Sequence, residues 1–365
     1  MSTTAALPSD AQVFFSHLVT TLGSYEYIFA AADLLINSLH VFILSRKHMR
    51  ISSMNSLLIG IAIADMVFPI IAIKKQLRIW ICGIGECVAP QGLLENNLDW
   101  ALYTWRDNFR RSSTWLGLML TIVRTVVVKK SSNQSFHFVF NSHFGWALVF
   151  FTEGISMFFS IFYYLRFQIV ESGTFWIPPV SCTQYPSGYS QQIYIYQERD
   201  FYKASNGLLR SIYLMAVGVF AKCLPCVLFP PLTIILIKEL RKENMARESA
   251  KKEQLIKRRK EMTTKLVIYM TALFLVIEFP IGVCFWIKGI SNDAENRNIP
   301  SIIIEILNMV YVVMSISHFF ICFSMSSQYR TTVKNMISKH FSNTQKSTSL
   351  ISVIHAKKLV RSSHV

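Results

Sequence analysis

The chain has 365 residues, of which 52% are hydrophobic and 16% are charged, and its mean hydropathy is +0.36. This composition is too apolar for a soluble domain and indicates a protein that spans a membrane several times. The formal net charge of +16 is typical of cations that meet anionic lipid beside membrane spans, and we expect no nucleic-acid partner.

Seven segments are long and apolar enough to cross about 30 Å of hydrocarbon. They cover residues 25–45, 54–73, 98–128, 144–165, 207–237, 264–288 and 301–325. The sequence therefore predicts an all-α membrane protein, in which residues 1–24 form an extracellular tail and residues 25–325 form the seven-transmembrane domain. The start of the chain lacks the basic and apolar regions of a signal peptide, so we expect the first span to direct insertion.

The basic residues predict how the chain is oriented in the membrane. If there are seven spans, 23 of the 37 Lys and Arg lie on one side, in three alternate loops and in the segment after residue 325. Because cytoplasmic loops carry an excess of cations, this side is the cytoplasm and the N-terminus is extracellular. We expect a multi-pass protein of the plasma membrane that meets anionic lipid at its cytoplasmic face. Residues 326–365 are predicted to form a short amphipathic eighth helix and a cytoplasmic tail.

Cysteine positions agree with this orientation. Cys82, Cys87 and Cys182 fall in predicted outer loops, where an oxidising environment permits a disulfide. We prefer a bridge from Cys87 to Cys182, which ties the outer end of the third span to the loop between the fourth and fifth spans. Spacing alone leaves Cys82 open as the partner of Cys182.

The third span carries far more charge than a lipid-facing helix tolerates. At about 100° per residue, Arg106, Arg110 and Arg124 point to nearly the same side of the helix. An arginine that faces lipid near mid-membrane costs at least ~2.5 kcal/mol, so this side faces a cavity or the interior of the bundle. Asp107 and Arg111 lie on the flank at a spacing that lets each neutralise the other.

Two interpretations of the outer arginines stay open. Arg106 and Arg110 contact an anionic group of a ligand, such as a carboxylate, or they complete ion pairs with interior acids, for which Glu153, Glu278 and Glu305 are available. Glu278 and Glu305 are equally suited to accept a basic group of a peptide ligand. We therefore predict Arg106, Arg110, Glu278 and Glu305 as ligand-binding residues.

Four motifs in register carry a family resemblance. These are "IAIAD" in the second span, "FRRSSTWLGLMLTIVRT" in the third, "EFPIG" in the sixth and "HFFICFSMSSQYR" at the end of the seventh. Over residues 25–340 the chain resembles the nematode serpentine receptor class W family, which is rhodopsin-like and similar to receptors for FMRFamide-type neuropeptides. The resemblance implies a rhodopsin-like seven-helix bundle without a cofactor, whose partners are a peptide or small-molecule ligand and a heterotrimeric G protein.

The resemblance also implies roles for individual residues. Asn37 and Asp65 correspond to an interior polar pair that is often near a sodium ion in rhodopsin-like receptors, and a packing hydrogen bond without an ion is the alternative. Pro280 resembles the proline that kinks the sixth helix and leaves a pivot for its outward swing. Arg124 corresponds to the inner arginine that takes part in G-protein coupling, and His318 stands where an asparagine normally starts the NPxxY motif.

One departure from the rhodopsin-like pattern concerns the restraint on the inactive state. The usual acidic residue before the inner arginine is missing, since Val123 precedes Arg124. The restraint on Arg124 is therefore weakened, and either basal activity rises or another contact takes over.

Other classes of membrane protein fit less well. An opsin needs a lysine in the seventh span, and residues 301–325 contain none. A zinc hydrolase needs a cluster of ligands, whereas His40 and His318 are the only deep histidines and lie on separate spans. We expect a G-protein-coupled receptor for a neuropeptide or a chemosensory ligand, which is not an enzyme. A multi-span solute transporter is the alternative, because charges in several spans also suit a solute path.

Overall fold

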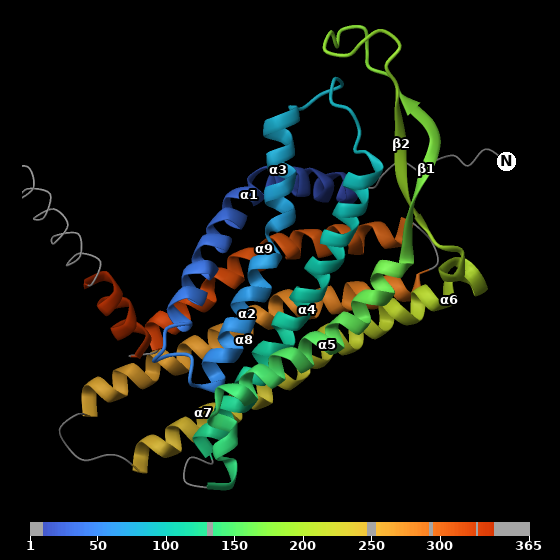
Figure 1. Cartoon of the computed structure of the whole chain (residues 1–365). Helices are drawn as coiled ribbons and strands as arrows, with labels where there is room; N and C mark the ends of the chain where they lie inside the picture. The colour runs from blue at the N-terminus through green and yellow to red at the C-terminus, as the bar shows by residue number, and fades with distance from the viewer. Residues whose placement is uncertain (1–9, 130–133, 247–252, 292–294, 326–327, 339–365) are drawn as a thin grey trace, which may run out of the picture. The chain divides into compact units, whose positions relative to one another are not determined.

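The computed structural model describes residues 10–129, 134–246, 253–291, 295–325 and 328–338. Helices account for most of this part of the chain (Figure 1). They are α1 (Asp10–Leu44), α2 (Ser53–Val67), α3 (Ile70–Cys82), α4 (Leu93–Lys129), η1 (Gln134–Phe140), α5 (Ser142–Arg166), α6 (Asp200–Ala216), η2 (Val217–Cys223), α7 (Leu224–Ala246), α8 (Glu253–Ile290) and α9 (Glu295–Met325). The chain divides into two compact units, Met1–Phe319 and Phe320–Val365.

Six stretches of the described residues are long and apolar enough to cross a membrane. They are Val13–Leu44, Ser53–Cys82, Ser142–Arg166, Asp200–Glu239, Thr271–Ile290 and Arg297–Ser324. Each of them matches a predicted span, and α4 matches the remaining one. Although α4 is too charged to qualify by composition, it packs against α2, α5 and α7. The predicted seven-helix bundle is thus confirmed.

The second span continues further than its composition suggests. The predicted span ended at residue 73, whereas the helical path runs through α2 and α3 to Cys82 and is interrupted only around Pro69. Proline has no amide hydrogen to donate to the helix, so the break at this position is expected. The helix continues beyond 73 because Lys74 and Arg78 pair with acids at the start of α4. Helix α1 likewise begins at Asp10, before the predicted start at residue 25.

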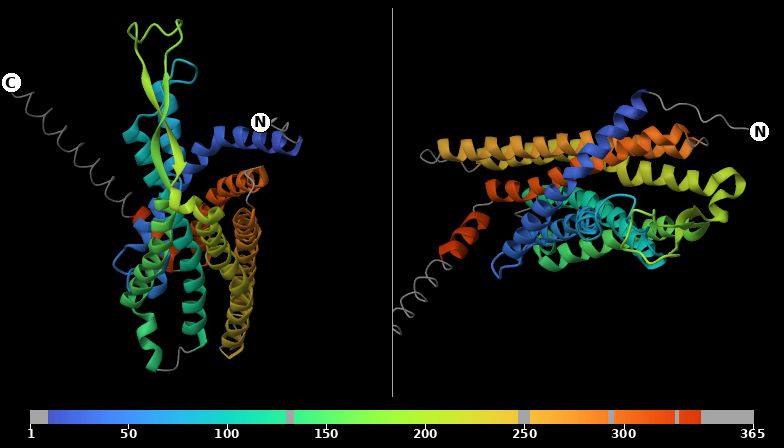
Figure 2. Two further views of the ribbon diagram at one scale, coloured as in Figure 1. Left: turned by 90° about the vertical axis from the view of Figure 1, so that its right-hand side faces the viewer. Right: turned by 90° about the horizontal axis from the view of Figure 1, so that it is seen from above.

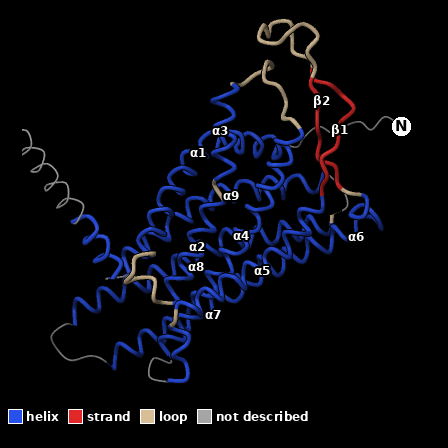
Figure 3. Tube along the Cα trace, viewed as in Figure 1, coloured by secondary structure: helices blue, strands red, loops and turns tan. Residues whose placement is uncertain are grey.

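A β-hairpin between α5 and α6 was not predicted. Strands β1 (Phe167–Trp176) and β2 (Gln191–Glu198) pair antiparallel, and they are the only strands in the part of the chain that the structure describes. The hairpin projects beyond the ends of α4 and α5 (Figures 2 and 3). At its base, Glu198 accepts hydrogen bonds from Arg166 of α5 (2.8 Å) and Arg210 of α6 (3.3 Å). These ion pairs fix where the hairpin leaves the helices.

Helices α2 and α5 approach closely at a glycine. A Cβ atom added at Gly145 of α5 would lie 2.5 Å from the carbonyl oxygen of Ser53 and 2.8 Å from the Ser53 Cα. Both are backbone atoms of α2, which cannot turn aside as a flexible side chain can. On the same helix, an added Cβ at Gly154 would meet nothing within 4 Å.

We expect Gly145→Ala to destabilise the purified protein by about 1 to 3 kcal/mol, because it forces α2 and α5 apart. Gly154→Ala is the matched control, and should leave stability unchanged or raise it slightly, since alanine favours helix. Thermal unfolding in detergent measures both. Equal melting temperatures for the two variants would contradict the close approach at Gly145.

The fifth span contains an irregular segment in mid-helix. The span begins with α6, whose backbone is not helical at Ser205, Asn206 and Gly207, where φ is 51°, 58° and 76°. The π-helix η2 follows and includes Lys222. Wide turns of this kind are frequent at functional sites, and this one holds a lysine in an apolar span.

The second unit contains the predicted eighth helix. Residues 328–338 are helical, which confirms it. Within this unit, Arg330 Nη1 donates hydrogen bonds to the carbonyl oxygens of Phe323 (3.1 Å) and Ser324 (2.6 Å). A cation at the last carbonyls of α9 stabilises the end of that helix. The predicted tail beyond residue 338 lies outside the described residues.

Candidate functional site

A cavity of about 380 Å³ lies where α1, α3, α4, α5, β2 and α9 meet. Its volume falls within the range of small-ligand sites, about 300 to 1,000 Å³. The lining residues run from Glu26 of α1 to Met309 of α9, so the cavity forms only when these distant segments pack together.

Four charged side chains line this cavity. They are Glu26 of α1, Lys75 of α3, Arg106 of α4 and Glu305 of α9. Glu26 interacts electrostatically with the other three, so the charges act on the same space. Among the described residues, no ion pair within 4.0 Å involves any of the four. The cavity therefore presents two acids and two bases that are available to a bound molecule.

An aromatic wall stands beside these charges. Trp100 stacks on Tyr163 with ring centroids 5.0 Å apart, and Tyr196 of β2 approaches Trp100 at 5.8 Å. The Trp100 indole donates a hydrogen bond to the carbonyl oxygen of Tyr164 (3.0 Å), which fixes its ring. Tyr103 completes the wall and lies under the Arg106 guanidinium. Such a wall can hold an apolar or aromatic body.

A disulfide ties the hairpin to the loop before α4. Cys87 bonds to Cys182, with Cα atoms 5.4 Å apart, which confirms the preferred pairing and leaves Cys82 as an exposed free thiol. Gln184 (2.9 Å) and Tyr185 (3.1 Å) also donate hydrogen bonds to the Cys87 carbonyl oxygen. The loop that joins β1 to β2 is thereby held to the segment that leads into α4, and β2 carries Tyr196 to the cavity wall.

Removal of this bridge with Cys182→Ser should cost about 2 to 5 kcal/mol of stability. Thermal unfolding measures this effect, and Cys82→Ser serves as the control. If Cys82→Ser had the larger effect, the assigned bridge would be wrong.

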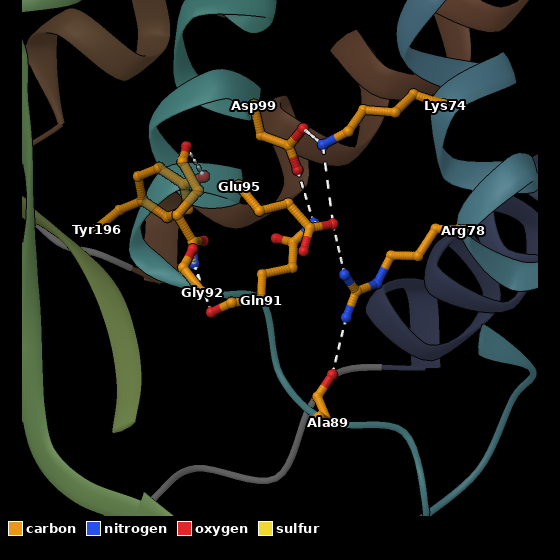
Figure 4. Close-up of polar contacts among 9 residues, drawn as sticks. Lys74, Arg78, Ala89, Gln91, Gly92, Glu95, Asp99 and Tyr196 are labelled. Atoms are coloured by element: carbon orange, nitrogen blue, oxygen red, sulfur yellow. Dashed lines mark hydrogen bonds and ion pairs between the residues drawn. The ribbon is translucent and has the colours of Figure 1, made fainter. Parts of the chain in front are cut away.

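Charged residues of α3 and α4 form a network next to the cavity (Figure 4). Lys74 pairs with Asp99, and Arg78 pairs with Glu95. Gln91 connects both acids, donating to Asp99 (2.7 Å) and to Glu95 (3.1 Å). Burial alone would raise the pKa of Glu95, but the hydrogen bonds from Arg78 and Gln91 outweigh it and hold the pKa below its ordinary value. The network fixes α3 against α4, and with it Lys75.

A second cluster of charge lies deeper in the bundle and is fully enclosed. Glu278 of α8 accepts hydrogen bonds from Arg110 Nη2 of α4 (3.0 Å) and from Lys222 Nζ of η2 (2.8 Å). The exposed fractions of these side chains are 0%, 6% and 3%. We call Arg110, Lys222 and Glu278 the buried triad. It joins three spans through one carboxylate and holds one more positive than negative charge.

A single aromatic ring connects the cavity to the buried triad. The guanidinium carbons of Arg106 and Arg110 both lie 5.6 Å from the centroid of the Phe68 ring. Phe68 also packs on Tyr311 of α9, at 5.2 Å between ring centroids, and Arg110 lies 4.7 Å from that ring. The Phe68 ring thus contacts both the arginine that lines the cavity and the arginine of the buried triad.

Asp65 is surrounded by donors from two other helices. Its Oδ1 accepts hydrogen bonds from Ser113 (2.7 Å) and Tyr311 (3.0 Å), and its Oδ2 lies 3.2 Å from Nδ1 of His318. The predicted bond partner, Asn37, donates instead to Asp33 on its own helix (2.7 Å). The interior polar group thus contains a second acid, and α1 is joined to α9 through Asp33 and Ser315.

The predicted ligand-binding residues divide between the two sites. Arg106 and Glu305 line the cavity, whereas Arg110 and Glu278 belong to the buried triad. Pro280 lies within α8, and Arg124 is partly buried near the end of α4. The predicted pair of Asp107 and Arg111 is confirmed at 2.9 Å.

Four ionisable residues with structural or cavity positions were not predicted from the sequence. Glu26 and Lys75 line the cavity, Lys222 completes the buried triad, and Asp33 joins α1 to α9. For Asp33 and Lys222, the signal was present as a lone charge within an apolar span. Glu26 and Lys75 lie at the margins of predicted spans, where charge is ordinary.

Comparison with known proteins gives one family. Residues 24–340 match the family model described as "Serpentine type 7TM GPCR chemoreceptor Srw". A search among curated proteins gave no match. The match covers both the cavity and the buried triad.

Proposed function

Because the chain belongs to the Srw family of serpentine 7TM GPCR chemoreceptors, we propose that it binds an extracellular ligand in the cavity and activates a heterotrimeric G protein. In this proposal the disulfide and the hairpin face the outside of the cell. The N-terminus is extracellular, and the C-terminus lies in the cytoplasm beside anionic lipid.

The observation that carries the proposal is the contact of both Arg106 and Arg110 with the Phe68 ring. One arginine faces the cavity and the other holds the carboxylate of α8. A ligand that draws Arg106 toward the cavity therefore changes the packing around Arg110. The receptor exchanges between a resting and an active conformation, and a ligand shifts this equilibrium toward the active one only if it binds that conformation more tightly.

The buried triad restrains α8 in the resting receptor. It supplies a restraint that the missing acid before Arg124 does not, since it ties the third and fifth spans to the sixth. Loosening of the contact between Arg110 and Glu278 lets α8 swing about Pro280, which lies just beyond the triad. The swing opens a cytoplasmic cleft in which Arg124 meets the G protein. His318 and Asp65 hold α9 against α2 as this happens.

A cell-based screen tests this function. Cells that express the chain with a set of G-protein α subunits are exposed to amidated peptides and to small volatile or soluble cues, and second messengers are recorded. We expect at least one compound to give a saturable response that requires a G protein. Compound-dependent uptake of a labelled solute in cells that lack the G protein would instead favour a transporter.

A further inference from the structure

The charges of the cavity point to the chemical class of the ligand, and this inference rests on the proposed receptor function. We propose that the cavity binds a small zwitterion that carries a carboxylate, an ammonium group and an apolar or aromatic body. An amino acid or a very short peptide with free ends has this chemistry.

The carboxylate end is read by the basic residues. Arg106 presents a planar guanidinium, whose fork of N–H donors matches a carboxylate. Its guanidinium lies over the rings of Phe68 and Tyr103. It forms no ion pair with the described part of the protein, so its N–H groups are available to a carboxylate. Lys75 supplies a second positive charge from α3.

The ammonium end is read by acceptors on α1 and α9. Glu26 and Glu305 are the acids of the cavity. Asn308 lies three residues after Glu305 on α9 and also lines the cavity. Its Oδ1 is buried and has no hydrogen-bond donor among the described residues. A buried acceptor without a donor is costly, and an ammonium beside Glu305 would supply the donor.

The size of the cavity restricts the body of the ligand. About 380 Å³ accommodates a molecule of a few residues at most. Trp100, Tyr163 and Tyr196 give this body an aromatic wall. A ligand with only one charge would leave either the two acids or the two bases without a partner. Charge-assisted hydrogen bonds are the strong ones, so a zwitterion gains from both sets.

The test uses matched probes that differ only in charge. The probes are the free amino acids and the dipeptides of phenylalanine with another amino acid. Each probe is compared with its C-terminal amide, its N-acetyl form and its doubly blocked form. Binding is measured by thermal stabilisation of the purified full-length chain, and signalling is measured separately by nucleotide exchange on a G protein. We expect one or more free zwitterions to bind at least about tenfold more tightly than each of their blocked forms, because each blocked form loses one charge-assisted contact.

Two variants assign the two ends of the probe. Arg106→Gln should remove the preference for the free carboxylate over the amide and leave the preference for the free amine. Glu305→Gln should do the reverse. Exposed residues outside the cavity provide the controls: Lys203→Gln for Arg106→Gln, and Glu171→Gln for Glu305→Gln. A variant that only misfolds would lose both preferences together, so the split distinguishes recognition from structure.

The outcomes separate this inference from the receptor function. Tighter binding of an amide, an N-acetyl form or a doubly blocked probe overturns the zwitterion class, and so does a failure of every zwitterion to bind. If an amidated peptide triggers nucleotide exchange and no free zwitterion binds more tightly than its blocked forms, the receptor function stands and the ligand class is overturned. A zwitterion that binds as predicted but triggers no exchange with any G protein supports the ligand class and contradicts the receptor function.

Discussion

Replacement of Glu278 by glutamine is expected to raise ligand-independent signalling at least tenfold and to lower the stability of the receptor. Glutamine is nearly the same size as glutamate but carries no charge, so Arg110 and Lys222 would be left without a counter-charge inside the bundle. Loss of one partner of a buried ion pair typically costs about 3 to 5 kcal/mol. Because the buried triad belongs to the resting state, its loss destabilises the resting state more than the active state. Each 1.4 kcal/mol of this difference shifts the equilibrium between the resting and active states about tenfold toward the active state.

Glu153→Gln is the matched control for this prediction. Glu153 of α5 accepts a hydrogen bond from Asn108 of α4 (3.0 Å), so it is also an acid within the bundle, but among the described residues its hydrogen-bond partners lie on α4. Basal nucleotide exchange should stay low in Glu153→Gln. Lys222→Met should have a smaller effect than Glu278→Gln, because it leaves a neutral pair of Arg110 and Glu278. Basal activity that is the same in Glu278→Gln as in the wild type would show that the buried triad does not restrain α8.

Replacement of Arg106 by alanine is expected to abolish the ligand response while surface expression stays intact. The guanidinium lines the cavity and forms no ion pair with the described residues, so its removal breaks none. A hydrogen bond to a charged group contributes about 1.5 to 3 kcal/mol. Loss of two such bonds to one carboxylate would shift the dose response by about 100-fold or more, since each 1.4 kcal/mol is a factor of ten. At concentrations that half-activate the wild type, the response of Arg106→Ala should therefore be absent.

Dose–response curves and surface labelling measure the effect of Arg106→Ala. Lys203→Ala, an exposed cation outside the cavity, is the control and should leave the curve unchanged. Arg106→Lys should retain part of the response, because the charge stays while the paired N–H donors are lost. An unchanged dose response in Arg106→Ala would remove this residue from the binding site.

Much of the fold could be predicted from the sequence because it depends on local patterns. Apolar length indicated the spans, and helical periodicity placed Arg106 and Arg110 on one side of α4. The pair of Asp107 and Arg111 follows from a spacing of four residues on one helix. The hairpin was missed, although "QQIYIYQE" in β2 alternates aromatic and β-branched residues as strands do.

The site was less predictable because its contacts join distant parts of the chain. Nothing local distinguishes Glu278, which is buried beside Lys222, from Glu305, which lines the cavity. Phe68 resembles any apolar residue of a span, yet its ring contacts two arginines of another helix. Asn37 bonds to Asp33 because that acid lies one turn away on α1, a partner that the resemblance to rhodopsin-like receptors did not indicate.

Nucleotide exchange on a purified G protein by the receptor in lipid vesicles tests the proposed signalling most directly. We expect an active compound to stimulate exchange by the wild type and to have no effect on Arg106→Ala. We also expect Glu278→Gln to stimulate exchange without any compound. Compound-dependent flux of a labelled solute into the vesicles, with no exchange on any G protein tested, would show that the protein is not a G-protein-coupled receptor.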